Sequence, residues 1–166
     1  DDCIVRPDFF EPSIDYRYEI VISPKMSFGT GHHETTFLMM NHMFELELND
    51  TSVLDIGCGT GILSILAEML GSTRILGIDI DRWSYENSLE NASINGSKLA
   101  KFRLCNVSEI SESFDVILAN ISSNIIISDI VKYFDLLNPE GNCLVSGFLS
   151  SDIKDIKYQA ENVGFK

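Results

Sequence analysis

Short apolar runs separated by amphipathic stretches organise most of this chain. Runs of strand length occur at residues 53–57, 74–79, 102–106, 114–120 and 142–148. Apolar residues with helical spacing occur at residues 62–70, 82–95, 123–137 and 150–163. Strands that alternate with helices in this order predict an α/β fold with a doubly wound, Rossmann-like parallel sheet and right-handed connections.

The N-terminal part of the chain has a weaker pattern. Residues 1–23 are predicted to be an extended leading segment, because they contain prolines and show no clear period until a strand at 18–22. A helix is expected over 34–48, and its apolar residues define the predicted buried face: Phe37, Leu38, Met40, Met43, Phe44 and Leu48. Residues 24–166 are predicted to form a single domain.

The turn after the first strand of that domain carries the most informative pattern. The run Val53-Leu54-Asp55-Ile56-Gly57-Cys58-Gly59-Thr60-Gly61 ends an apolar strand in an acidic residue and then places a glycine at every second position. Glycines let the backbone turn tightly and approach a ligand with no Cβ in the way. A second carboxylate, Asp79, follows about 20 residues later, where a ribose-binding carboxylate is expected. These features predict a nucleoside-containing cofactor at the carboxyl edge of the sheet; the alternative is a turn that only connects strand and helix.

The spacing of the glycines distinguishes two kinds of cofactor. Dinucleotide-binding turns have the pattern G-x-G-x-x-G and place a pyrophosphate at the helix N-terminus. Here the pattern is D-x-G-x-G-x-G, and no lysine or arginine lies between Asp55 and Glu68. An acidic strand end suits a cationic ligand better than a pyrophosphate, so a nicotinamide-dependent dehydrogenase is disfavoured. The turn resembles the first motif of class I S-adenosylmethionine-dependent methyltransferases, and S-adenosylmethionine is the expected cofactor.

Composition narrows the classes of partner. The chain has 166 residues, is 45% hydrophobic and carries a net charge of −13. Its length allows one domain with a substantial core, and its charge argues against direct binding of nucleic acid while permitting a basic protein partner. No apolar stretch approaches the roughly 20 residues of a membrane span, so no membrane association is expected. The cysteines lack metal-type spacing and are expected to be reduced thiols of a cytoplasmic protein: Cys3, Cys58, Cys105 and Cys143.

Some polar residues are expected to have structural roles. The side chains of the adjacent His32 and His33 diverge, so no metal site is expected there. Glu34 suits the first turn of the helix that follows, and Asp81 is expected to cap the helix at 82–95.

Three segments together resemble one family. Met26-Ser27-Phe28-Gly29-Thr30-Gly31-His32-His33-Glu34-Thr35-Thr36 is similar to its F-G-T-G-x-H-x-T-T signature. The turn within 54–63 is similar to its cofactor loop, and Leu118-Ala119-Asn120-Ile121 is similar to its A-N-I motif at the end of a strand. The family is that of the ribosomal protein L11 methyltransferases, called PrmA in bacteria, and the resemblance covers roughly residues 20–165.

The resemblance implies roles for individual residues. Cofactor contacts are expected at Gly29, Thr30, Thr36, Asp55, Gly57, Gly59, Asp79 and Asn120. Asp79 would hold the ribose hydroxyls by charge-assisted hydrogen bonds, and Asp55 would orient the glycine turn or meet the amino group of the cofactor. Asn120 and Phe28 are the expected catalytic residues: Asn120 would help to place the incoming amine, and Phe28 would lie near the sulfonium or the substrate cation.

The resemblance also implies an activity. It is methylation of lysine and N-terminal amines of ribosomal protein L11, a basic protein. Ile121-Ser122-Ser123 follows Asn120 in place of a Pro-Pro-Tyr motif, which disfavours planar amide or base substrates. The alternatives are methylation of another protein or a small amine, and a cofactor-binding core that is inactive without a recognition domain. The family's N-terminal recognition domain and the last two strands of the class I fold are expected to be absent from this chain.

Overall fold

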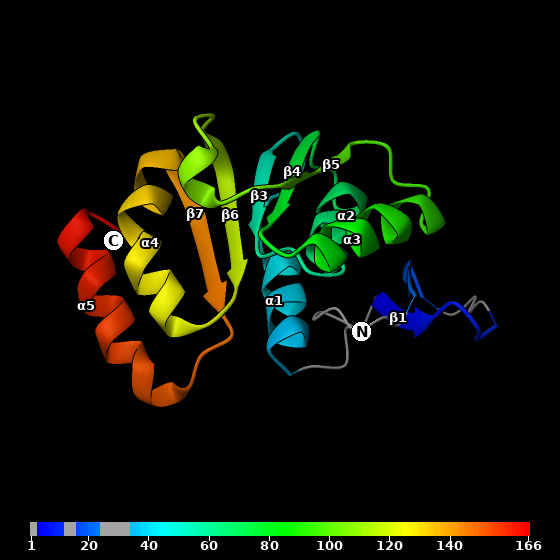
Figure 1. Ribbon diagram of the computed structural model, residues 1–166, viewed down its shortest axis with the longest axis horizontal. Helices are drawn as coiled ribbons and strands as arrows, with labels where there is room; N and C mark the ends of the chain where they lie inside the picture. The colour runs from blue at the N-terminus through cyan, green and yellow to red at the C-terminus, as the bar shows by residue number, and fades with distance from the viewer. Residues whose placement is uncertain (1–2, 12–15, 24–33) are drawn as a thin grey trace.

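The main sheet of the molecule is parallel throughout and has five strands (Figure 1). The computed structural model describes residues 3–11, 16–23 and 34–166. The strands are β3 (Ser52–Ile56), β4 (Arg74–Asp79), β5 (Ala100–Leu104), β6 (Phe114–Asn120) and β7 (Leu137–Ser146). Their order across the sheet is β5-β4-β3-β6-β7, and every neighbouring pair is parallel. The predicted doubly wound sheet is confirmed, and its strand order reverses between β3 and β6.

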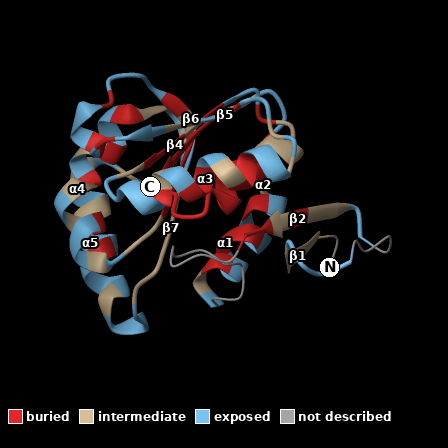
Figure 2. Ribbon diagram, turned by 45° about the vertical axis from the view of Figure 1, so that its right-hand side comes forward, coloured by how far each residue is buried: buried red, intermediate tan, exposed pale blue. Residues whose placement is uncertain are grey.

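Helices cover both faces of this sheet. They are α1 (Glu34–Glu45), α2 (Ile62–Met69), α3 (Arg82–Ile94), α4 (Ser123–Leu136) and α5 (Ile153–Val163), with short 3-10 turns η1 (Val107–Glu109) and η2 (Ser150–Asp152). Successive strand residues point to opposite faces, so Val53 joins the apolar cluster under α1 and α2, whereas Leu54 joins the one under α4 and α5. Figure 2 shows buried residues concentrated in the central strands and on the inward sides of the helices. None of the helices in the described residues is long and apolar enough to cross a membrane.

The leading segment contains a strand that the sequence did not indicate. Strand β1 (Cys3–Pro7) pairs in parallel with β2 (Tyr18–Ile22) in a separate two-stranded sheet. The Arg6 guanidinium binds the Glu19 carboxylate across this pair, with an Nε–Oε1 distance of 2.8 Å. The extended conformation predicted for this segment agrees with β1, but its pairing was not predicted, because it depends on a partner strand further along the chain. The predicted strand β2 is confirmed.

The buried face of helix α1 matches the predicted face only in part, because Met40 and Met43 are buried as predicted and other residues differ. Its buried residues are Thr36, Met39, Met40 and Met43. Phe37 and Leu38 are 57% and 51% exposed, so their assignment to the buried face was wrong. Apolar residues surround most of this helix, and periodicity alone cannot choose between its faces. Packing against the sheet buries the face that carries Thr36 and the methionines. Phe44 is 38% exposed, and its ring lies against that of Tyr18 at a centroid distance of 5.6 Å.

Several predicted boundaries moved. Strand β5 begins at Ala100, two residues before the predicted start, and β7 begins at Leu137 directly after α4. Residues 138–141, between the predicted helix and the predicted strand, lie inside β7 as an irregularity, because the register shifts from Phe114–Leu137 to Val116–Asn142. The helix at 34–48 ends at Glu45.

Candidate functional site

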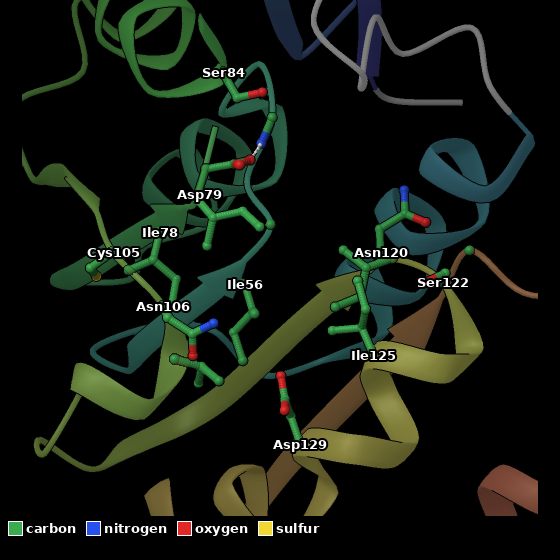
Figure 3. A pocket seen from close by; sticks show the side chains of 16 residues that line it. Ile56, Ile78, Asp79, Ser84, Cys105, Asn106, Asn120, Ser122, Ile125 and Asp129 are labelled. Atoms are coloured by element: carbon green, nitrogen blue, oxygen red, sulfur yellow. Dashed lines mark hydrogen bonds between the residues drawn. The ribbon is translucent and has the colours of Figure 1, made fainter. Parts of the chain in front are cut away.

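A cavity of about 480 Å³ opens at the carboxyl ends of β3, β4 and β6, where the strand order of the sheet reverses. Its apolar wall includes Ile56, Ile78, Ile80, Val107, Ile121 and Ile125. Its polar lining includes Asp79, Ser84, Asn106, Asn120, Ser122 and Asp129 (Figure 3). The volume lies within the range of small-molecule and cofactor sites, roughly 300–1,000 Å³.

The glycine turn shapes one side of this cavity. Gly57 has a φ of 68°, a left-handed conformation that side chains with a Cβ rarely adopt. A Cβ at this position would lie 2.5 Å from the Ile121 Cγ2 atom. The amides of Gly57 and Cys58 both donate to the Ile78 carbonyl, at 2.9 and 3.0 Å, and fix the turn against β4. The turn therefore requires glycine at position 57 and leaves its backbone exposed to the cavity.

The carboxylate of Asp79 lies at the end of β4 and faces the glycine turn. Its Oδ2 atom accepts a hydrogen bond from the Gly59 amide at 3.0 Å, and its Oδ1 atom accepts one from the Asp81 amide at 2.9 Å. Each carboxylate oxygen retains capacity for a further donor. Asp81 caps α3 as predicted, because its carboxylate accepts a hydrogen bond from the Ser84 amide at 2.8 Å.

The side-chain amide of Asn120 lies at the end of β6. Its Nδ2 atom donates to the Thr36 hydroxyl of α1 at 3.2 Å, and Thr36 is itself 1% exposed. The Asn120 Oδ1 atom is buried and has no hydrogen-bond partner among the described residues. A buried amide oxygen without a partner is costly, so this acceptor is suited to a donor that a ligand brings. Asn120 lines both the large cavity and a smaller one of about 10 Å³.

Asp55 lies behind the glycine turn. It is 1% exposed, and its carboxylate accepts hydrogen bonds from the amide and hydroxyl of Ser64 at the start of α2, at 3.1 and 2.7 Å. Burial raises the pKa of Asp55 to about 7, and the nearby charge of Asp79 also raises it. Asp55 lines the smaller cavity together with Thr36 and Asn120 and does not line the larger one.

The structure brings most of the predicted site residues together. The large cavity is lined by Gly57, Gly59, Asp79 and Asn120. The Thr36 hydroxyl lies next to these residues and accepts a hydrogen bond from the Asn120 side chain. The other predicted contacts lie outside the described residues: Phe28, Gly29 and Thr30. Within the described ranges, there is no group of three or more histidine, cysteine, aspartate or glutamate side chains that could hold a metal ion.

Other cavity residues were not singled out from the sequence. Asn106 and Val107 follow β5, and their position after a strand of the sheet was the available signal. The Glu109 carboxylate accepts a hydrogen bond from the Asn106 amide at 2.8 Å in a helix-capping arrangement. Asp129 lies within α4, where no local pattern marks it as a cavity residue.

Together these features define a class of protein. A glycine turn after β3, a carboxylate at the end of β4 and a cofactor-sized cavity at the reversal of strand order are the arrangement of a class I S-adenosylmethionine-dependent methyltransferase. The family described as ribosomal protein L11 methyltransferase (PrmA) matches residues 1–166. The chain belongs to this family.

Individual relatives agree with that assignment. The chain is 43% identical over 166 residues to the ribosomal protein L11 methyltransferase of Porphyromonas gingivalis, covering 99% of this chain and 57% of that protein. It is 40% identical over 168 residues to the enzyme of Phocaeicola vulgatus, covering 100% of this chain and 60% of that protein. A crystal structure of a ribosomal protein L11 methylase from Lactobacillus delbrueckii subsp. bulgaricus has a TM-score of 0.91 at 27% identity, covering 99% of this chain and 86% of that one. The chain therefore spans less than two thirds of the length of the two curated relatives.

Proposed function

We propose that this chain binds S-adenosylmethionine and transfers its methyl group to amines of ribosomal protein L11. The observation that carries the proposal is the buried Oδ1 atom of Asn120, which has no partner among the described residues and lies at the edge of a cofactor-sized cavity. Such an acceptor suits the N–H group of an incoming amine. Family membership and the function named for the relatives support the same reaction.

The residues of the cavity fit the cofactor. The backbone of Gly57 and Gly59 would face it without a Cβ, and Asp79 would accept hydrogen bonds from the ribose hydroxyls. The carboxylate of Asp79 favours a cationic ligand over a pyrophosphate. Thr36 and Asn120 would lie at the methionine end, and Phe28, Gly29 and Thr30 are proposed to cover it. When bound, S-adenosylmethionine supplies an electrophilic methyl group on a sulfonium.

The protein's part in the reaction is to present a neutral amine in line with that methyl group. A free lysine amine has a pKa of about 10.4 and is mostly protonated at neutral pH. Loss of water beside a positive sulfonium would lower that pKa, because the charged ammonium would be disfavoured. The Asn120 Oδ1 atom would then accept a hydrogen bond from the neutral amine and orient its lone pair. Thr36 keeps that oxygen available, because its hydroxyl holds the Nδ2 side of the amide.

The charge of the chain fits the proposed substrate. Its net charge of −13 would attract a basic ribosomal protein and repel the phosphates of RNA. An enzyme that acts on this substrate would work in the cytoplasm. The competing proposals are another protein or small-amine substrate, and a chain that binds the cofactor without transferring its methyl group.

Cofactor binding is tested by calorimetric titration of the chain with S-adenosylmethionine. The Asp79→Ala variant should bind about ten- to a hundredfold more weakly, because charge-assisted hydrogen bonds to the ribose are lost. The matched control is Asp155→Ala, which removes an exposed carboxylate of α5. No binding by a folded wild-type chain, or equal loss in both variants, would contradict the proposed site.

Methyl transfer is tested by mass spectrometry of ribosomal protein L11 incubated with the chain and S-adenosylmethionine. The full-length Porphyromonas gingivalis enzyme serves as the positive control. Asn120→Ala should lower turnover about a hundredfold, and Thr36→Val about tenfold, because the amide loses its orientation. Unchanged turnover in Asn120→Ala would refute the role of the amide. Cofactor binding without transfer would favour the inactive core, and transfer to a different protein would favour another substrate.

A further inference from the structure

One carboxylate in the cavity has no part in the function proposed above. Asp129 lies on α4, lines the large cavity and is half-buried beside the apolar residues Ile56 and Ile125. Its Oδ1 atom accepts a hydrogen bond from the Ser128 hydroxyl at 2.8 Å. Figure 3 shows its side chain directed into the cavity between the two isoleucines. The Asp129 carboxylate retains acceptor capacity beyond its bond to Ser128, so a donor on a ligand that fills the cavity could bind to it.

The position of Asp129 indicates which part of the cofactor it would meet. Figure 3 places Asp79 and Asn120 in the upper part of the cavity and Asn106 and Asp129 in the lower part. With the ribose at Asp79 and the methyl group near Asn120, the remaining region is the one beside η1, which also contacts α4. Its wall is mainly aliphatic and includes Val107, which suits the face of a planar base.

Asn106 and Asp129 offer complementary hydrogen-bonding groups in this region. The Asn106 Oδ1 atom already accepts a hydrogen bond from the Ser108 amide at 2.9 Å, which leaves its Nδ2 donor for the cavity. The carboxylate oxygens of Asp129 offer acceptors. Adenine presents a donor, its exocyclic amine, next to ring-nitrogen acceptors. A donor from Asn106 and an acceptor from Asp129 match that pair, whereas a 6-oxo purine presents an acceptor where adenine has the amine.

We infer that Asp129 accepts a hydrogen bond from the exocyclic amine of the cofactor's adenine and so selects adenosyl over 6-oxo analogues. The inference rests on the proposed binding of S-adenosylmethionine in this cavity. Asp129 is then a specificity-determining residue that acts on the nucleobase, far from the transferred methyl group. A carboxylate that only faces solvent and Ser128 would not respond to the identity of the base.

The test compares two ligands that differ at the base. S-adenosylhomocysteine and S-inosylhomocysteine are titrated calorimetrically into the wild-type chain and the Asp129→Asn variant. Neither ligand has a sulfonium, so loss of one negative charge does not favour one over the other. The wild type should prefer the adenosyl ligand about ten- to a hundredfold, and Asp129→Asn should reduce that preference about tenfold, because an asparagine amide can donate to the 6-oxo group.

Controls separate this inference from a general effect on folding or charge. Asp135→Asn removes an exposed carboxylate of the same helix and should leave the preference unchanged. Asp129→Glu keeps the charge and displaces the carboxylate, so it should also reduce the preference; it replaces Asp129→Asn if that variant does not fold. An adenosyl preference that is equal in the wild type and in the Asp129 variants overturns the inference, while the proposed function stands. Failure of the folded wild type to bind either ligand overturns both.

Discussion

Replacement of Asp55 by asparagine should change how the stability of this protein depends on pH. Asp55 is 1% exposed, and burial raises its pKa from an ordinary value of 3.8 to about 7. The native state therefore binds a proton at this carboxyl more tightly than the unfolded state does. Its contribution to stability is complete below about pH 4 and is lost as the pH rises through about 7. Asparagine keeps nearly the same shape, can still accept from Ser64, and does not titrate.

The size of the effect follows from the two pKa values. One pKa unit corresponds to about 1.4 kcal/mol, so the difference between 3.8 and about 7 amounts to about 4 kcal/mol. Ser64 limits the penalty, because its amide and hydroxyl hydrogen bonds favour the ionised form. Relative to the wild type, the Asp55→Asn variant should gain up to about 4 kcal/mol in free energy of unfolding between pH 4 and pH 8.

Urea denaturation of both proteins across this pH range measures the difference directly. Subtracting the two curves removes the carboxylates that titrate in the opposite direction, such as Asp115, whose pKa is lowered by its hydrogen bonds to Ser52 and Asn138. Asp155→Asn, at an exposed site on α5, is the control for loss of one negative charge. A difference between wild type and Asp55→Asn that does not vary with pH would refute the assignment of a buried, proton-binding Asp55.

Other substitutions test the turn, a helix cap and the core. Gly57→Ala should lower the free energy of unfolding by about 1–2 kcal/mol and weaken cofactor binding, because its φ is 68° and its Cβ would meet Ile121; unchanged calorimetric affinity would contradict this. Asp81→Ala should lower the free energy of unfolding, measured with denaturant, by about 1 kcal/mol, because the carboxylate that accepts from the Ser84 amide is lost. An unchanged free energy of unfolding would mean that this cap is not stabilising. Tyr133→Phe should raise the melting temperature, because the buried hydroxyl has no partner among the described residues; a lower melting temperature would reveal one.

Local signals determined the order of elements and part of the site. Strand and helix periods repeat within a few residues, so β3, α2, β4 and β6 were predictable almost to the residue. The glycine turn and Asp79 were predictable for a similar reason, because one strand–helix–strand unit brings them together. The short distance in sequence between Gly59 and Asp79 makes their contact a property of that unit.

Only the tertiary structure decided the rest. The hydrogen bond between Thr36 and Asn120 joins residues 84 positions apart, and it exists because α1 lies across the carboxyl end of β6. The strand β1 also depends on tertiary structure, because its hydrogen bonds need β2 as a partner. The sheet likewise determines which face of α1 is buried, because apolar residues lie on most sides of this helix. Asn106 and Asp129 share a cavity because parallel strands in the order β5-β4-β3-β6-β7 bring their carboxyl ends to one edge. Periodicity reports which side of an element is apolar, but the packing of distant elements decides which polar side chains meet there.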